Sequence, residues 1–356
     1  MRRLPFLASA LLAFFFTLAT SFADSSEPDF LKPDTNILFL GDSITQGGTY
    51  IAYIQSYLWQ RYPDRNYNLI NLGLGSETAS GLSETDHPFP RPNIHARIDR
   101  ALAAAKPDLT FICYGMNDGI YHPASKKRFA AHRDGMLALI EKVRATGSEI
   151  ILLTPPPFDA ETKRLKGGSV VDKNAPDFGY KTPYEKYDSV LQGYGKWVLR
   201  KHNGVARSID IHTPVKNDLA TIRASYPDYE YGDGIHPNDH GHFIIARSIL
   251  EALDAPGIDL LPDSSKPTPD SNLTRAMPLI LERHGLISAA WREHVGHSKP
   301  KKEDVPPLPE AQRQADSMEV EIRSILSKPE RQVRRMSQPV GDHQLEYLLQ
   351  TPSGEK

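Results

Sequence analysis

The sequence predicts an α/β protein in which five parallel strands form one sheet between two layers of helices. Short apolar runs that lack polar alternation are typical of inner strands buried on both faces. Each run is followed by a stretch with helical spacing, and glycine-rich or polar loops separate the two. This alternation indicates right-handed crossovers and helices on both faces. We expect the flavodoxin-like strand order 2-1-3-4-5, in which the first and third strands are neighbours.

Length and composition fit one large soluble domain with a smaller appendage. The chain has 356 residues, of which 39% are hydrophobic and 24% charged, within the range of globular proteins. A formal net charge of -2 gives no basic surface for nucleic acid and no acidic tail.

The amino terminus resembles a targeting segment. Arg2 and Arg3 precede an apolar run over 4–18. Ser21-Phe22-Ala23 then supplies small residues where a signal peptidase would cut. We expect residues 1–23 to be a cleaved signal peptide, with an uncleaved anchor as the alternative. The mature protein would then be exported, periplasmic or secreted, with no membrane insertion.

Cys113 is the only cysteine, so no internal disulfide can form.

The α/β domain is expected over 24–255. Its strands are predicted at 37–40, 67–72, 109–113, 149–153 and 205–211. Its helices are predicted at about 51–61, 93–105, 127–145, 183–202 and 239–253, the last with Asn238 as N-cap. The segment 158–182 shows no clear period, and loops of that length are often functional.

Prolines mark a linker after residue 255 and begin a predicted helical extension over 256–328. Two helices are expected there, at 276–295 and 310–326, separated by Lys299-Pro300-Lys301-Lys302. The extension could pack back on the sheet domain or contact a partner or a second copy. Packing of the extension against the sheet domain is favoured, because isolated short helices are only marginally stable in water. The polar tail 329–356 is expected to be partly disordered.

The first strand runs directly into Gly41-Asp42-Ser43. Gly41 permits a sharp turn that places Ser43 at the carboxyl edge of the sheet, where open α/β sheets bind ligands. Ser43 is therefore a candidate nucleophile, although a serine after a strand is also a common helix N-cap. Asp42 is expected to be structural and to accept hydrogen bonds in the turn.

A nucleophilic serine needs a base, a group that orients the base, and donors for an oxyanion. His236 follows Asp233 by three residues, so the carboxylate can reach Nδ1 while Nε2 faces Ser43. The Ser43 N–H, an N–H of the loop 73–76 and the Asn117 amide are the candidate oxyanion donors.

A zinc site at His236, His240 and His242 is disfavoured, because Pro237 and the start of a helix separate the first histidine from the others.

Four segments in this order resemble the blocks of the GDSL or SGNH hydrolase superfamily. They are Gly41-Asp42-Ser43-Ile44-Thr45, the loop 73–78, Gly115-Met116-Asn117-Asp118 and Asp233-Gly234-Ile235-His236-Pro237. The resemblance covers about 36–253. It implies a three-layer α/β/α fold and ester hydrolysis through a serine acyl-enzyme without any cofactor.

The second block departs from the family pattern, which usually has glycine as the oxyanion donor just before an acid and a threonine. Here Ser76 precedes Glu77-Thr78, and Gly75 stands one residue earlier. A backbone N–H can donate from any residue type whose φ and ψ are attainable. The register favours Ser76 as the second donor and leaves Gly75 as the alternative.

Export, polar loops at the sheet edge and the lack of an apolar lid favour a short acyl group such as acetyl on a carbohydrate. The partner expected is thus a small-molecule or carbohydrate ester. A lysophospholipase or thioesterase is the alternative enzyme and should have an apolar groove built from 158–182. A non-catalytic carbohydrate-binding or scaffold protein on the same fold is the alternative outside enzymes.

Overall fold

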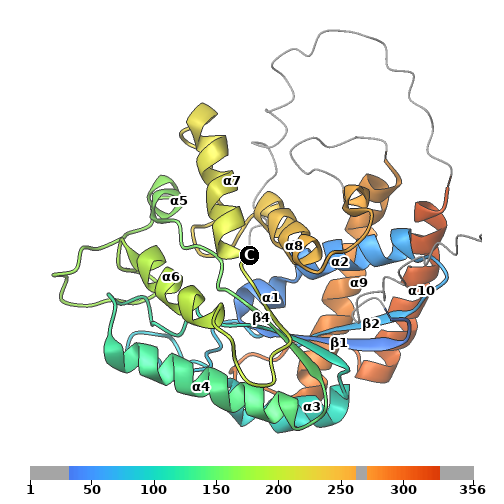
Figure 1. The fold of residues 1–356 in the computed structure, drawn as a ribbon, viewed down its shortest axis with the longest axis horizontal. Helices are drawn as coiled ribbons and strands as arrows, with labels where there is room; N and C mark the ends of the chain where they lie inside the picture. Colours follow the sequence, from blue (N-terminus) through green and yellow to red (C-terminus); the bar gives the residue numbers. More distant parts are fainter. Residues whose placement is uncertain (1–31, 262–270, 329–356) are drawn as a thin grey trace, which may run out of the picture.

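The computed structural model describes residues 32–261 and 271–328 (Figure 1). The predicted signal peptide 1–23, part of the predicted linker (262–270) and the predicted tail 329–356 lie outside the described residues. Within the described ranges, no helix has the length and apolar character needed to cross a membrane.

The described part of the chain contains a five-stranded parallel sheet in the order β2-β1-β3-β4-β5, which confirms the predicted fold class and strand order. The strands are β1 (Thr35–Gly41), β2 (Tyr67–Asn71), β3 (Leu109–Cys113), β4 (Glu149–Leu153) and β5 (Arg207–Ile209). Gly41 pairs with Cys113, so β1 and β3 end level at the carboxyl edge.

Helices cover both faces of the sheet, as Figure 1 shows for α3 and α4 on one side and α2 and α8 on the other. One layer contains η2 (Ile94–Ala96), α3 (Ile98–Ala105), α4 (Lys126–Arg144) and α6 (Tyr187–Val198). The other contains α2 (Thr49–Arg61), α7 (His212–Ser225), α8 (Asp239–Ala252) and η3 (Ile258–Leu260). Two short helices, α1 (Ser43–Gly47) and α5 (Ala160–Leu165), follow β1 and β4.

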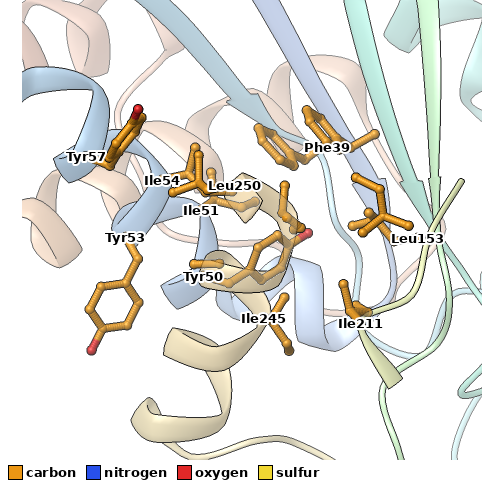
Figure 2. Packing of buried hydrophobic residues seen from close by; sticks show 14 of the residues in the cluster. Phe39, Tyr50, Ile51, Tyr53, Ile54, Tyr57, Leu153, Ile211, Ile245 and Leu250 are labelled. Atoms are coloured by element: carbon orange, nitrogen blue, oxygen red, sulfur yellow. The ribbon is translucent and has the colours of Figure 1, made fainter. Parts of the chain in front are cut away.

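The larger core lies between the sheet and the layer of α2 and α8. Figure 2 shows Ile51 and Ile54 of α2 close to Leu250 of α8, with Phe39 of β1 nearby. Phe39 also stacks on Phe111 of β3, with ring centroids 4.8 Å apart. Burial of these apolar side chains fixes β1 and β3, the strands that end in the two central loops.

Two predictions in the second half of the domain are wrong in part. Strand β5 is shorter than 205–211, because Asp210 accepts hydrogen bonds from His212 N and Thr213 N (both 3.0 Å) and starts α7. The segment 158–182 contains α5, which the sequence did not predict. Asp159 caps α5 by accepting from Thr162 N (3.0 Å), and Arg223 of α7 donates two hydrogen bonds to Asp159.

The extension forms two packed helices, α9 (Asn272–Val295) and α10 (Leu308–Leu326), that lie against α2. Trp59 of α2 is buried among Ile280 of α9 and Ile322 of α10. Its Nε1 donates to Glu319 Oε1 (3.2 Å). The described part of the extension is therefore joined to the α/β domain by an apolar contact of its own.

Candidate active site

Ser43 is the first residue of α1, directly after the sharp turn that ends β1. Asp42 caps this helix, and its Oδ1 accepts a hydrogen bond from Ile44 N (3.0 Å). A Cβ on Gly41 would lie 2.2 Å from Thr45 Oγ1 and 2.8 Å from the Cys113 carbonyl oxygen. Only glycine fits at this close approach, so the turn holds Ser43 at the carboxyl edge of the sheet.

The structure brings Ser43, His236 and Asp233 into one hydrogen-bonded chain. His236 Nε2 lies 2.8 Å from Ser43 Oγ, and His236 Nδ1 lies 2.8 Å from Asp233 Oδ2. The other carboxylate oxygen of Asp233 accepts from the N–H groups of Ile235 (2.8 Å) and His236 (2.7 Å). Both carboxylate oxygens are thus fixed, and the carboxylate fixes the imidazole orientation. The His236 side chain remains 45% exposed, which leaves room for a substrate beside Ser43.

The charges of Asp233 and His236 stabilise each other's ionised form. Burial acts to lower the pKa of His236, but the hydrogen bond and the charge of Asp233 outweigh it and raise that pKa above its usual value. Burial acts to raise the pKa of Asp233, but His236 and the two backbone N–H groups hold it well below its usual range. Asp233 therefore stays ionised and favours the protonated form of His236.

Asp42 lies behind this chain and is 3% exposed. Burial raises its pKa to about 7, while its hydrogen bond from Ile44 N acts in the opposite direction. Its charged form also favours the protonated form of His236.

In the loop after β2, two neighbouring N–H groups have different environments. Gly75 N donates to Gln46 Oε1 (2.5 Å), whereas no acceptor is found for Ser76 N among the described residues. Ser76 has φ +67°, a left-handed conformation that favours glycine. Its Oγ lies 3.2 Å from His87 Nε2, and its carbonyl oxygen accepts from Arg91 Nη1 (3.3 Å).

A buried ion pair anchors the same loop immediately after Ser76. The Glu77 carboxylate accepts from Arg97 Nε (2.7 Å) and Nη2 (2.6 Å), and from the Tyr114 hydroxyl (2.6 Å). Asn117 Nδ2 donates to the Glu77 carbonyl oxygen (3.2 Å), while Asn117 Oδ1 accepts from the Tyr121 hydroxyl (3.0 Å). These bonds set the orientation of the Asn117 amide beside the loop and use only one of its two N–H donors.

Sequence reasoning missed two residues that hold the loop. Gln46 binds Gly75, as described above. Asn71 Oδ1 accepts from Gly73 N (2.9 Å), and Asn71 Nδ2 donates to the Thr45 carbonyl oxygen (2.7 Å), which ties α1 to the loop. Asn71 interrupts the predicted strand 67–72, as Asn68 does, so the sequence marks two polar positions there without singling out Asn71.

The two histidines that follow the fourth block, in α8, lie in separate environments. His240 Nε2 is 2.7 Å from Asp218 Oδ2, and the buried His242 ring stacks on Tyr50. Among the described residues, the group with metal-ligand spacing is Glu293, His297 and Glu303 in the extension. Arg292 already binds both oxygens of Glu303 (2.6 and 2.7 Å).

Comparison with protein families adds an independent finding. Residues 39–244 match the model of the GDSL-like Lipase/Acylhydrolase family, which is more than half of the chain. The chain belongs to this family. The predicted superfamily is thereby confirmed, and the protein is an ester hydrolase.

Individual relatives are more distant. The chain is 24% identical to an acetylxylan esterase of Geobacillus stearothermophilus over 61% of this chain and 93% of that protein. A solved structure of an acetylxylan esterase from that organism has 20% identity and a TM-score of 0.45, covering 65% of this chain and 97% of the other. A gut microbial diltiazem-metabolizing enzyme has 20% identity and a TM-score of 0.49 over 63% of this chain, which spans 47% of that enzyme.

Proposed function

We propose that this family member is an exported serine esterase that removes acetyl groups from carbohydrate by way of an acyl-enzyme. The observation that carries the mechanism is the chain of 2.8 Å contacts from Ser43 Oγ through His236 to Asp233. Nucleophile, base and orienting carboxylate then stand in the geometry that acyl transfer requires.

In the first half of the reaction, Ser43 Oγ attacks the ester carbonyl carbon while His236 Nε2 takes the hydroxyl proton. Asp233 holds the Nδ1–H and offsets the charge on the ring. When the tetrahedral adduct collapses, the bond to the alcohol oxygen breaks, His236 gives its proton to that oxygen, and the acetyl group remains esterified to Ser43 Oγ. Water, deprotonated by His236, then attacks the acetyl carbonyl, and the proton returns to Ser43 as acetate leaves.

Three donors are proposed for the oxyanion: the N–H of Ser43, the N–H of Ser76 and the second Nδ2–H of Asn117. Ser76 is preferred over Gly75 because the Gly75 N–H is already bonded to Gln46 Oε1. The anchors at Glu77 and Asn71 hold these donors in place before substrate arrives, which is the condition under which such donors accelerate reactions most.

An acetyl substrate is supported by the acetylxylan esterase relative at 24% identity. The surroundings of the site favour the same choice, because aromatic side chains of the segment 158–182, such as Phe158 and Tyr180, pack into a cluster with Tyr187. They are thereby used in packing rather than left to line an apolar groove for a long acyl chain.

The test compares acetate release from acetylated polysaccharides with hydrolysis of long-chain p-nitrophenyl esters. We expect activity on the acetylated polymers, and labelling by a fluorophosphonate probe that is lost in Ser43→Ala. The exposed Ser189→Ala is the matched control and should label normally. Activity confined to long-chain esters would favour the lysophospholipase or thioesterase alternative. Absence of Ser43-dependent labelling would favour the scaffold alternative.

Export is tested on the same full-length chain. The mature protein should begin after Ala23 when produced in a bacterium with a general secretion pathway, and mass spectrometry of the purified protein measures this directly. A product that keeps residues 1–23 would contradict the proposed signal peptide.

A further inference from the structure

A lysine from the extension stands beside the nucleophile. The position that a Cβ on Gly75 would occupy lies 3.3 Å from Lys299 Nζ, 3.0 Å from Gln46 Oε1 and 3.8 Å from Ser43 Cβ. The ammonium group and the nucleophilic residue therefore both lie within 4 Å of one point in the loop after β2. Gly75 leaves open the space in which these groups meet.

The segment that carries Lys299, between α9 and α10, is held at several points. Lys299 N donates to His297 Nδ1 (3.2 Å), and Lys302 Nζ donates to the His297 carbonyl oxygen (2.9 Å). Just before it, Arg100 of α3 donates to the Val295 carbonyl oxygen (2.9 Å). The position of Lys299 is thus set by the fold.

The charge of Lys299 is not neutralised by a close carboxylate. Across residues 32–261 and 271–328, no carboxylate oxygen is found within 4.0 Å of its Nζ. Of the nearby acids, Glu303 of the same segment is bound by Arg292, and Glu293 of α9 accepts through Oε1 from His297 Nε2 and Glu303 N. Partial burial lowers the pKa of Lys299, and the charge of Glu303 acts in the opposite direction without offsetting it. An anion bound near the ammonium would therefore stabilise its charged form.

A cavity of about 270 Å³ lies between the extension and the loop after β2, and Ser298, the residue before Lys299, is one of its lining residues. Leu74, Asn93, Arg100 and His297 also line it, together with the Glu77 and Arg97 side chains, whose charges are paired with each other. Arg100 donates only to carbonyl oxygens within the described residues, so it adds a second positive charge without a carboxylate partner. With these polar and positively charged groups in its lining, the cavity next to Ser298 suits an anionic, hydroxyl-bearing group.

We propose that Lys299 is a specificity-determining residue of the Ser43 site and selects acetyl esters whose alcohol part carries a carboxylate, such as acetylated acidic sugars. The inference rests on the proposed acetyl esterase function. Because an acetyl group has no charge, the anion that Lys299 recognises must belong to the alcohol. Lys299 acts on binding of the substrate and takes no part in proton transfer.

The experiment measures kcat and KM for 4-acetoxybenzoate and for 4-acetoxybenzamide, two esters of similar shape whose alcohol part carries a carboxylate in the first and a neutral amide in the second. The variants are Lys299→Met, Lys299→Arg and the control Lys301→Met, which removes an exposed charge from the same segment. The ratio of the two kcat/KM values is compared between variants, so the intrinsic reactivity of each ester cancels.

We expect Lys299→Met to lower the preference for the benzoate by about 5-fold, mainly through KM, as for a partly exposed charge pair. Lys299→Arg should restore most of the preference, and Lys301→Met should match the wild type. An unchanged ratio in Lys299→Met, or an equal loss on both esters, would overturn the role of Lys299 while Ser43-dependent hydrolysis remained intact. A wild type without Ser43-dependent activity on either ester would instead overturn the esterase function and this inference with it.

Discussion

The ion pair between Glu77 and Arg97 gives the sharpest stability prediction, because both side chains are almost fully buried. The Arg97 side chain is 3% exposed and that of Glu77 0%. Arg97→Met leaves an ionised carboxylate in the interior with the Tyr114 hydroxyl as its remaining side-chain partner. Breaking a buried pair in this way costs about 3–5 kcal/mol, because the remaining charge stays desolvated.

The converse change, Glu77→Gln, leaves the Arg97 guanidinium with the Leu72 carbonyl oxygen, to which its Nη2 donates (2.7 Å), and should cost a similar amount. The double variant removes both charges. Its cost should therefore be close to that of one single change, which corresponds to a coupling energy of about 3–5 kcal/mol.

The assay is urea-induced unfolding of the four proteins in a double-mutant cycle, followed by tryptophan fluorescence. The exposed pair Arg144 and Glu141, with side chains 49% and 55% exposed, serves as control and should couple by about 0.5 kcal/mol or less. The variants at Glu77 and Arg97 should each also lose activity on 4-nitrophenyl acetate, because Glu77 follows Ser76 and its carbonyl oxygen binds Asn117. Additive single costs at Glu77 and Arg97 would refute the reasoning.

Three further changes probe the site and its support. Asn117→Ala should lower kcat by about 10²-fold with less effect on KM in steady-state kinetics, as for a donor that acts in the transition state; comparable losses in both constants would contradict this. Asp233→Asn should lower kcat by about 10⁴-fold. Asp233 raises the pKa of His236, and only the neutral ring accepts a proton. In Asp233→Asn the acid limb of the kcat/KM profile should therefore move to lower pH, and a limb that stays in place or moves to higher pH would refute the coupling. Burial lowers the pKa of His284 to about 3, so only the unfolded chain gains this proton below about pH 6.5, and stability is lost as pH falls from there. Urea unfolding of His284→Leu at pH 6.5 and 5 should show a loss smaller than wild type by about 2 kcal/mol, and an equal loss in both proteins would contradict it.

The central part of the fold could be predicted because its strands are buried on both faces. Runs such as 109–113 and 149–153 contain hardly any polar residues, and their predicted bounds agree with β3 and β4. The strand order then followed from the alternation of strands and helices. It also placed the ends of β1 and β3, and therefore the loops of Ser43 and Asn117, at one edge.

Elements that depend on tertiary contacts were harder to predict. Helix α7 has Val215, Leu219 and Ile222 at helical spacing, but polar residues separate them and Pro214 stands in the first turn. Helix α5 is too short to show a period and is held by the pair between Asp159 and Arg223. Contacts between positions far apart in the sequence leave no local pattern.

The approach of Lys299 to Gly75 is one of these contacts between positions far apart in the sequence. A second contact joins the extension to Asn71 at the end of β2. His284 of α9 lies with Nε2 3.0 Å from Asn71 Nδ2. Asn71 Oδ1 accepts from Gly73 N, which fixes the amide orientation, so Nδ2 must donate and His284 Nε2 must accept. The ring can accept only while this nitrogen carries no proton, in agreement with the low pKa of the buried ring. Protonation of His284 would break the contact to Asn71, the residue that ties α1 to the loop after β2, and the support that α9 gives to this loop therefore depends on a neutral His284.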